Sequence, residues 1–190
     1  MKDVYLVDGA RTPFLKAKGK PGPFSAADLA VQAGQALLKR QPFTPNEIGE
    51  VVLGCVMPSP DETNIARVVA LRLGCGKTVP AWTVQRNCAS GLQALDSAAK
   101  DIALGRYDLV LAGGTEAMSR APLLYSTAMA TWLAGLQSAK TWQAKSKALL
   151  RLRPSYFKPI IALLQGLTDP TVNLNMGQTA ENVAYQFNIT

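Results

Sequence analysis

The sequence predicts an α/β protein in which helices cover a mixed or largely parallel β-sheet. Short apolar runs bounded by turn residues are typical of buried strands, and such runs recur along the chain. Amphipathic helical segments lie between them, which is the pattern of a layered α/β fold. The 190 residues, with 48% apolar content, are enough for one core of ordinary size, or one core and part of a second unit.

Four apolar runs are the predicted strands. Each is short and apolar at successive positions, as expected for strands that are buried on both faces of a sheet. The runs are residues 4–7, 51–53, 81–84 and 109–112.

Two predicted helices have clear start and stop signals. The first follows Ser25, which can form a capping box with Asp28, and it ends near Arg40. The second begins after Asn64 and stops at Gly74, a residue suited to a left-handed C-cap.

A third predicted helix starts around Cys88. Apolar residues recur along it at three- and four-residue steps, and Gly105 closes it before the last predicted strand. The stretch before Cys88 runs from a strand through a tight turn. The sequence therefore places this cysteine at the start of a helix, at the carboxyl end of a strand.

The formal charge of +7 is concentrated in one segment. Residues 117–168 hold seven basic residues and no Asp or Glu, whereas the remaining thirteen basic residues are balanced by thirteen acidic ones. Such a segment attracts polyanions, whether nucleic acid, an anionic membrane surface or a phosphorylated ligand. The pattern of alternating strands and helices also stops here. We therefore place an α/β core at residues 1–118 and an inserted, mostly helical loop subdomain at residues 119–190.

Composition excludes several classes of protein. We expect no secretion signal and no spanning helix, since no apolar run approaches the roughly 18 residues that a span needs. Cys55, Cys75 and Cys88 form no CxxC pair, which favours reduced thiols in the cytoplasm. The chain has no histidine, so it lacks the commonest general base and the commonest zinc ligand, and we expect no metal site.

Cys88 is the candidate nucleophile. The backbone N–H groups and the dipole of a helix start favour a thiolate, and the same groups can stabilise the oxyanion formed when a thiolate attacks a thioester. The small residues Ala89, Ser90 and Gly91 permit close approach of a substrate. Taken alone, a cysteine in this position is more often a small buried side chain.

The sequence around Cys88 favours the functional interpretation. Four blocks resemble those of the thiolase family and occur in the family's order: DGARTPF at residues 8–14, NCASGL at 87–92, GGTEAMS at 113–119 and MGQTAEN at 176–182. The resemblance spans nearly the whole chain. The cysteine block and the Gly-Gly-Thr-Glu block are its most specific parts.

The resemblance implies a thiolase-like fold and a two-step reaction on 3-ketoacyl-CoA, and it favours long-chain substrates of fatty-acid degradation. Cys88 would take the acyl group and pass it to coenzyme A, which is a substrate, so no cofactor is needed. The family's catalytic histidine and second cysteine lie in a C-terminal half that these residues do not include. We therefore expect the isolated chain to be nearly inactive, as a fragment, a truncation or half of a split enzyme.

Other positions are weaker candidates. The resemblance makes Met176 a substrate-contact residue, and Asn87 and Met118 are further substrate-binding candidates. Met118 equally suits packing in a core or a dimer. Glu116 is expected to hold a loop by hydrogen bonds. Cys55 and Cys75 are expected to be buried.

The basic segment allows two interpretations. Its lysines and arginines form a solvated face, or, with interleaved Trp132, Trp142 and leucines, they form amphipathic helices for a membrane surface or a partner groove. The insert resembles that of the long-chain thiolase subunit of β-oxidation complexes, which implies a homo-oligomer or a complex subunit with peripheral membrane contact. The competing non-enzymatic hypothesis is a truncated scaffold that binds through this insert. No nucleic-acid motif accompanies the charge.

Overall fold

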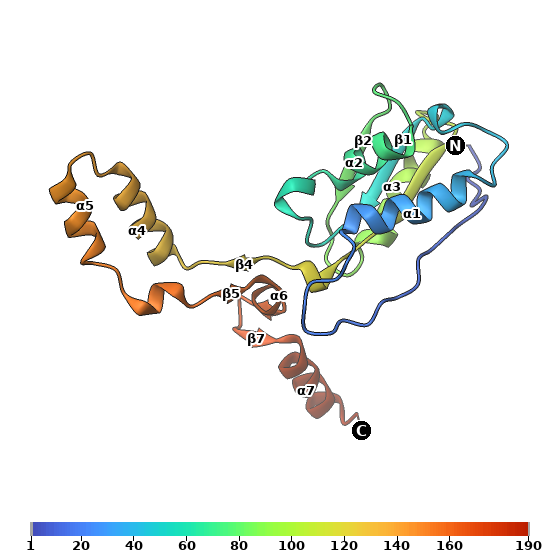
Figure 1. Cartoon of the computed structure of the whole chain (residues 1–190). Helices are drawn as coiled ribbons and strands as arrows, with labels where there is room; N and C mark the ends of the chain where they lie inside the picture. Colours follow the sequence, from blue (N-terminus) through green and yellow to red (C-terminus); the bar gives the residue numbers. More distant parts are fainter. Residues whose placement is uncertain (1, 190) are drawn as a thin grey trace. The chain divides into compact units, whose positions relative to one another are not determined.

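A computed structural model describes residues 2–189, which form two compact units that divide after Arg120. The first unit holds the main sheet and its helices (Figure 1). Its elements are α1 (Ala26–Leu38), β1 (Glu50–Gly54), α2 (Ile65–Leu73), β2 (Ala81–Val84), α3 (Ser90–Ala103) and β3 (Val110–Gly114), with short 3-10 turns η1 (Pro45–Glu47), η2 (Pro60–Glu62) and η3 (Met118–Arg120).

The main sheet has three strands in the order β2-β1-β3, and both pairings are parallel. Val51 of β1 pairs with Ala81 on one side and with Leu111 on the other. Each crossover between parallel strands carries a helix, as a βαβ connection requires. The carboxyl ends of all three strands therefore lie at one edge of the sheet.

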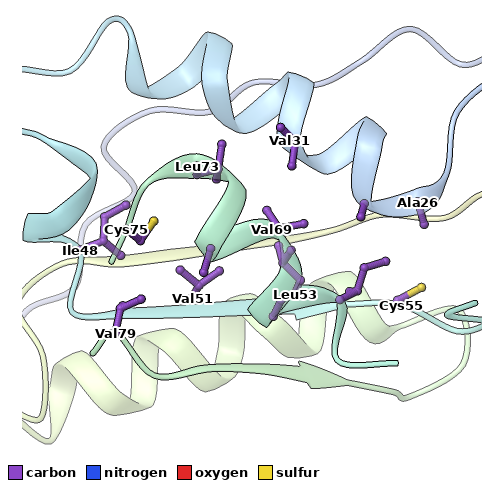
Figure 2. Close-up of a cluster of buried hydrophobic side chains, with 14 residues drawn as sticks. Ala26, Val31, Ile48, Val51, Leu53, Cys55, Val69, Leu73, Cys75 and Val79 are labelled. Atoms are coloured by element: carbon purple, nitrogen blue, oxygen red, sulfur yellow. The ribbon is translucent and has the colours of Figure 1, made fainter. Parts of the chain in front are cut away.

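The hydrophobic core lies between the sheet and the helices α1 and α2. Figure 2 shows Val51, Leu53 and Cys55 of the β1 segment packed with Val31 of α1 and Val69 of α2. Because side chains alternate along a strand, the intervening positions of β1 face the other side, where α3 packs. α3 thus covers the sheet face opposite to the core.

The predicted start and stop signals of the first two helices are confirmed. The Ser25 side chain accepts a hydrogen bond from the Asp28 amide, and Asp28 returns a bond to the Ser25 amide, which completes the capping box. Asn64 caps the Arg67 amide, and Gly74 ends α2 with a left-handed φ of 83°. The predicted strands at residues 51–53, 81–84 and 109–112 correspond to β1, β2 and β3.

The predicted strand at residues 4–7 is wrong, because these residues form no strand. Tyr5, Leu6 and Val7 are between 76% and 86% exposed, and no other strand of residues 2–189 pairs with them. A strand needs a partner for its backbone groups, which β propensity alone does not provide. The segment is instead held by the Lys2–Asp108 ion pair at 2.7 Å and by the Arg40–Asp8 pair at 3.0 Å.

The second unit combines helices with two short antiparallel ladders, β4 with β5 and β6 with β7. Among its described residues, Met129 is the buried apolar side chain. Its elements are β4 (Leu123–Leu124), α4 (Thr127–Ser138), α5 (Trp142–Leu149), η4 (Pro154–Phe157), β5 (Ile160–Ile161), α6 (Ala162–Gly166), β6 (Thr168–Asp169), β7 (Leu174–Asn175) and α7 (Met176–Phe187).

Candidate active site

Cys88 lies in the turn that joins β2 to α3, at the carboxyl edge of the parallel sheet. β2 ends at Val84 and α3 begins at Ser90, so the cysteine precedes the helix by two residues. Its side chain is exposed, whereas Cys55 and Cys75 are buried as expected. Ligands of open α/β sheets bind outside the carboxyl ends of the strands, and Cys88 is the thiol that this chain presents there.

The turn around Cys88 has a well-defined backbone. Asn87 takes a left-handed conformation with φ 47°, which asparagine tolerates better than most residues. The Ala89 amide donates to the Arg86 carbonyl at 3.1 Å, and the Ser90 amide donates to the Asn87 carbonyl at 3.1 Å. The chain thus reverses over a few residues, which leaves Cys88 at the outer side of the bend.

The first turn of α3 rests directly on two strands of the sheet. A Cβ at Gly54 of β1 would lie 2.3 Å from the carbonyl carbon of Ser90 and 2.6 Å from the amide nitrogen of Gly91. A Cβ at Gly114 of β3 would lie 3.0 Å from the Gly91 Cα. Both positions need glycine because backbone touches backbone there. The helix start that follows Cys88 is therefore fixed at van der Waals distance from the sheet.

The start of α3 has no side-chain cap. Its N-cap residue is Ala89, whose side chain cannot accept a hydrogen bond from the helix amides. The amide of Cys88 itself has no hydrogen-bond partner within residues 2–189. The Cys88 amide and the positive end of the helix dipole are therefore available beside the exposed thiol, whereas the Ala89 and Ser90 amides are bonded within the turn.

Glu116 holds the loop after β1, the role expected for it. Its carboxylate accepts hydrogen bonds from the amides of Val56 at 2.8 Å and Met57 at 3.3 Å, and the Cys55 thiol lies 3.6 Å from the same group. Burial, together with the charge of Glu116, raises the pKa of Cys55 to about 12. Cys55 thus remains a protonated thiol and is not a competing nucleophile.

The other candidate residues are distributed over both units. Asn87 shares the Cys88 turn, and Met118 begins η3 in the same unit, where it is 47% exposed and so is not a core residue. Met176 is the first residue of α7 in the second unit and is 50% exposed. Within residues 2–189, no cluster of three or more His, Cys, Asp or Glu is placed to hold a metal ion.

Two features of the site are not indicated by the sequence. Its pattern marks Ser90 only as a small residue, whereas the Ser90 hydroxyl makes two hydrogen bonds to the Cys88 turn. The pattern also does not show that position 54 needs glycine. A glycine at the end of an apolar strand, such as Gly54 in β1, is a signal that another stretch of backbone lies against the strand there.

Comparison with known proteins matches the chain to one protein family. The model of the family described as "Thiolase, N-terminal domain" matches residues 4–190. A 3-ketoacyl-CoA thiolase of Vibrio cholerae serotype O1 is 34% identical over 187 residues, which cover 98% of this chain and 42% of that protein. One from Photorhabdus laumondii is 30% identical over the same coverage. The chain therefore spans less than half the length of these relatives.

Solved structures show the same fold. The acetyl-CoA acetyltransferase of Bacillus anthracis superposes with a TM-score of 0.71 at 35% identity, covering 88% of this chain and 38% of that one. Human mitochondrial 3-ketoacyl-CoA thiolase, solved in complex with CoA, gives a TM-score of 0.69 at 30% identity with the same coverage.

Proposed function

Because this chain belongs to the thiolase family, whose N-terminal domain it matches over residues 4–190, we propose that it performs the acyl-accepting step of a 3-ketoacyl-CoA thiolase. The proposed nucleophile is Cys88. The observation that carries the proposal is the exposed thiol in the β2–α3 turn, beside an uncapped helix start. The proposed substrate contacts are Asn87, Met118 and Met176, of which Asn87 lies in the same turn.

The step follows from the chemistry of the site. In thiolysis the Cys88 sulfur attacks the 3-keto carbonyl of a 3-ketoacyl-CoA, the C2–C3 carbon–carbon bond breaks, and the thiol proton passes to C2 of the departing acetyl-CoA. The same kind of acyl-cysteine forms when Cys88 attacks the thioester of an acyl-CoA and coenzyme A leaves with the thiol proton. In the second half-reaction another coenzyme A takes the acyl group from Cys88. The free amide of Cys88 and the dipole of α3 stabilise the negative charge that develops on the carbonyl oxygen.

The described residues supply no histidine base to take the proton from the Cys88 thiol. The sequence contains no histidine, so it has no imidazole to accept the thiol proton. We therefore expect slow acylation of Cys88 by this chain alone. Added imidazole should accelerate the acylation, because it provides a base whose pKa lies near neutral pH.

The proposal is tested by incubating the 190-residue chain with acetyl-CoA and measuring its intact mass. We expect an acetyl adduct that disappears when excess coenzyme A is added, since the second half-reaction removes the acyl group. Cys88→Ala should form no adduct. Cys75→Ala, which removes a buried thiol, should behave like the unmodified chain. An adduct that persists in excess coenzyme A would count against a transfer intermediate.

The substrate class and setting are part of the same proposal. The names of the curated relatives support 3-ketoacyl-CoA substrates in fatty-acid β-oxidation, with coenzyme A as the acyl acceptor. We propose a homo-oligomer or a subunit of a β-oxidation complex. The three free cysteines fit the reducing cytoplasm. Across residues 2–189, no helix is both long and apolar enough to traverse a bilayer.

We further propose that the α4–α5 region contacts an anionic membrane surface, the function that a non-catalytic scaffold would also have. Trp142 is 80% exposed and Leu150 is 87% exposed, and Lys145 and Lys147 lie on the helix between them. A groove of about 810 Å³ between α4 and α5 adds Arg151 to this surface. Exposed aromatic and aliphatic side chains among cations are typical of interfacial helices.

Vesicle sedimentation tests this second proposal. We expect binding to vesicles with anionic lipid that weakens with salt, because the attraction of Lys and Arg to the surface is screened. Lys147→Gln combined with Arg151→Gln should weaken binding. Lys16→Gln combined with Lys18→Gln changes the net charge equally, but in the first unit, and should not. Equal binding to neutral and anionic vesicles would exclude the electrostatic contact.

A further inference from the structure

The hydroxyl of Ser90 forms hydrogen bonds with the turn that precedes its own helix. The side chain is only 3% exposed, and it accepts a hydrogen bond from the Arg86 amide at 2.8 Å and donates one to the Asn87 carbonyl at 2.7 Å. Both bonds run backwards from the helix into the turn that carries Cys88. A buried hydroxyl with its donor and an acceptor site both occupied is fixed in one rotamer, because any other would leave polar groups unpaired.

The direction of these bonds separates α3 from the other long helices of the described chain. Each of α1, α2, α4, α5 and α7 has a side chain that caps its own first amides. In α3 the serine at the first helical position bonds to the preceding turn, and Ala89 gives no cap. The hydroxyl therefore stabilises the turn and does not cap α3. The Ala89 and Ser90 amides are bonded to carbonyls of the turn, whereas the Cys88 amide has no partner within residues 2–189.

The backbone of Ser90 is held from the opposite side. Gly54 and Gly114 bring β1 and β3 against the first turn of α3, so the helix start has no room to shift toward the sheet. The two hydrogen bonds of the Ser90 hydroxyl then connect this helix start to Arg86 and Asn87, the two residues that precede Cys88 in the chain. Asn87 is in the left-handed region, a conformation that persists when surrounding contacts determine it.

We propose that Ser90 is a positioning residue for the acyl transfer proposed at Cys88. Its hydroxyl locks the turn of residues 86–90, so that the thiol stays exposed and next to the uncapped start of α3. Without the hydroxyl, the left-handed Asn87 loses a hydrogen bond to its carbonyl and the turn relaxes. The thiol then moves away from the helix amides, although the rest of the fold is retained. This inference rests on the proposed function of Cys88.

Alkylation of Cys88 by iodoacetamide tests the inference without any substrate. We expect Ser90→Ala to react about tenfold more slowly at neutral pH, because the relaxed turn no longer holds the thiol exposed beside the start of α3. Ser90→Thr, which retains the hydroxyl, should recover most of the rate. The matched control is Ser97→Ala on the same helix, whose hydroxyl binds Gln93 rather than the turn.

Two outcomes would overturn the proposal. One is a Ser90→Ala variant with the alkylation rate of Ser97→Ala. The other is a Ser90→Ala variant that unfolds at lower urea but, when folded, alkylates like the unmodified chain, which would show a purely structural role. Failure of acetyl-CoA to label the unmodified chain, with alkylation still sensitive to Ser90, would reject the acyl transfer and retain the positioning of the thiol.

Hydrogen exchange of the backbone amides tests the inference in the unmodified chain, without any substitution. The Arg86 amide is bonded to the buried Ser90 hydroxyl, whereas the Cys88 amide has no partner within residues 2–189. In the unmodified chain the Arg86 amide should therefore exchange at least about tenfold more slowly than the Cys88 amide, after correction for intrinsic rates. Equal protection of the two amides would mean that the hydroxyl does not hold the turn.

Discussion

Gly54 lies directly beneath the backbone of Ser90, with no space for a side chain between β1 and the start of α3. A Cβ at this glycine would approach the Ser90 carbonyl oxygen to 2.4 Å, which is shorter than any real Cβ contact. The position of the helix that follows Cys88 is thus set by the absence of a side chain on the neighbouring strand.

Replacing this glycine should displace the helix start. We expect Gly54→Ala to lower the free energy of unfolding by about 1–3 kcal/mol, the usual cost of inserting a methyl group where none fits. Gly135→Ala is the matched control, because it adds the same methyl group within α4 where nothing lies within 4 Å. The control should be neutral or stabilising by up to about 1 kcal/mol. Urea unfolding is followed by tryptophan fluorescence in a chain that also carries Trp132→Phe and Trp142→Phe, so that Trp82 reports on the first unit. An unchanged midpoint for Gly54→Ala would contradict the close packing.

Replacing Glu116 by glutamine should release the loop after β1. The backbone amides of Val56 and Met57 each donate to one oxygen of the Glu116 carboxylate. A glutamine side chain has one oxygen and one NH₂ group, so one of these two backbone donors would face the NH₂ group and lose its acceptor. We expect Glu116→Gln to lose about 1–3 kcal/mol in urea unfolding, the cost of an unsatisfied buried donor. Glu181→Gln on the exposed surface of α7 should change little. Equal midpoints for the two variants would show that the carboxylate does not hold the loop.

The three thiols should differ sharply in reactivity. Burial raises the pKa of Cys75 as it does that of Cys55, whereas Cys88 is exposed. A disulfide reagent at about pH 8 should therefore modify one thiol rapidly in the folded chain and all three in denaturant. Peptide mapping should assign the fast thiol to Cys88. Rapid modification of Cys55 would show that the first unit does not keep its core.

Glu50 should make the free energy of unfolding decrease as the pH rises, which is the opposite of the usual effect of a carboxylate. It is 5% exposed, it accepts one hydrogen bond from the Trp82 indole at 2.9 Å, and its other oxygen has no partner among the described residues. Burial raises the pKa of Glu50 above its usual 4.5, and Asp101 raises it further, while the Trp82 bond and the charge of Arg106 lower it. The folded state therefore prefers the protonated acid. Its contribution is fully present below about pH 4.5 and is lost as pH rises through the folded pKa.

The neutral variant Glu50→Gln removes this titration. Its stability relative to the unmodified chain should increase between about pH 4 and about pH 7 in urea unfolding, because only the unmodified chain must bury a charge at the higher pH. Glu47 gives the opposite control. Hydrogen bonds from the backbone and side chain of Thr44 lower the pKa of Glu47, so the relative stability of Glu47→Gln should decrease over the same interval. A Glu50→Gln difference that is constant with pH would mean that folding does not raise the pKa of Glu50.

Local signals predicted much of the first unit. The Ser25 capping box and the Gly74 C-cap could be identified because each depends on residues a few positions apart in the sequence. The failure at residues 4–7 has a different cause, since pairing depends on a partner strand that periodicity does not reveal. The contact between Gly54 and Ser90 could not be foreseen because it joins residues from separate elements across the sheet.

The central claim is that Cys88 is the acyl acceptor, and locating the acetyl group tests it most directly. The chain is incubated with acetyl-CoA and imidazole, digested at acidic pH to preserve thioesters, and mapped by tandem mass spectrometry. The account predicts acetylation of Cys88, with Cys55 and Cys75 unmodified because both thiols are buried. Acetylation that persists elsewhere in Cys88→Ala at the same rate, or an unlabelled Cys88 in a chain shown to be folded by its protected Cys55, would contradict it.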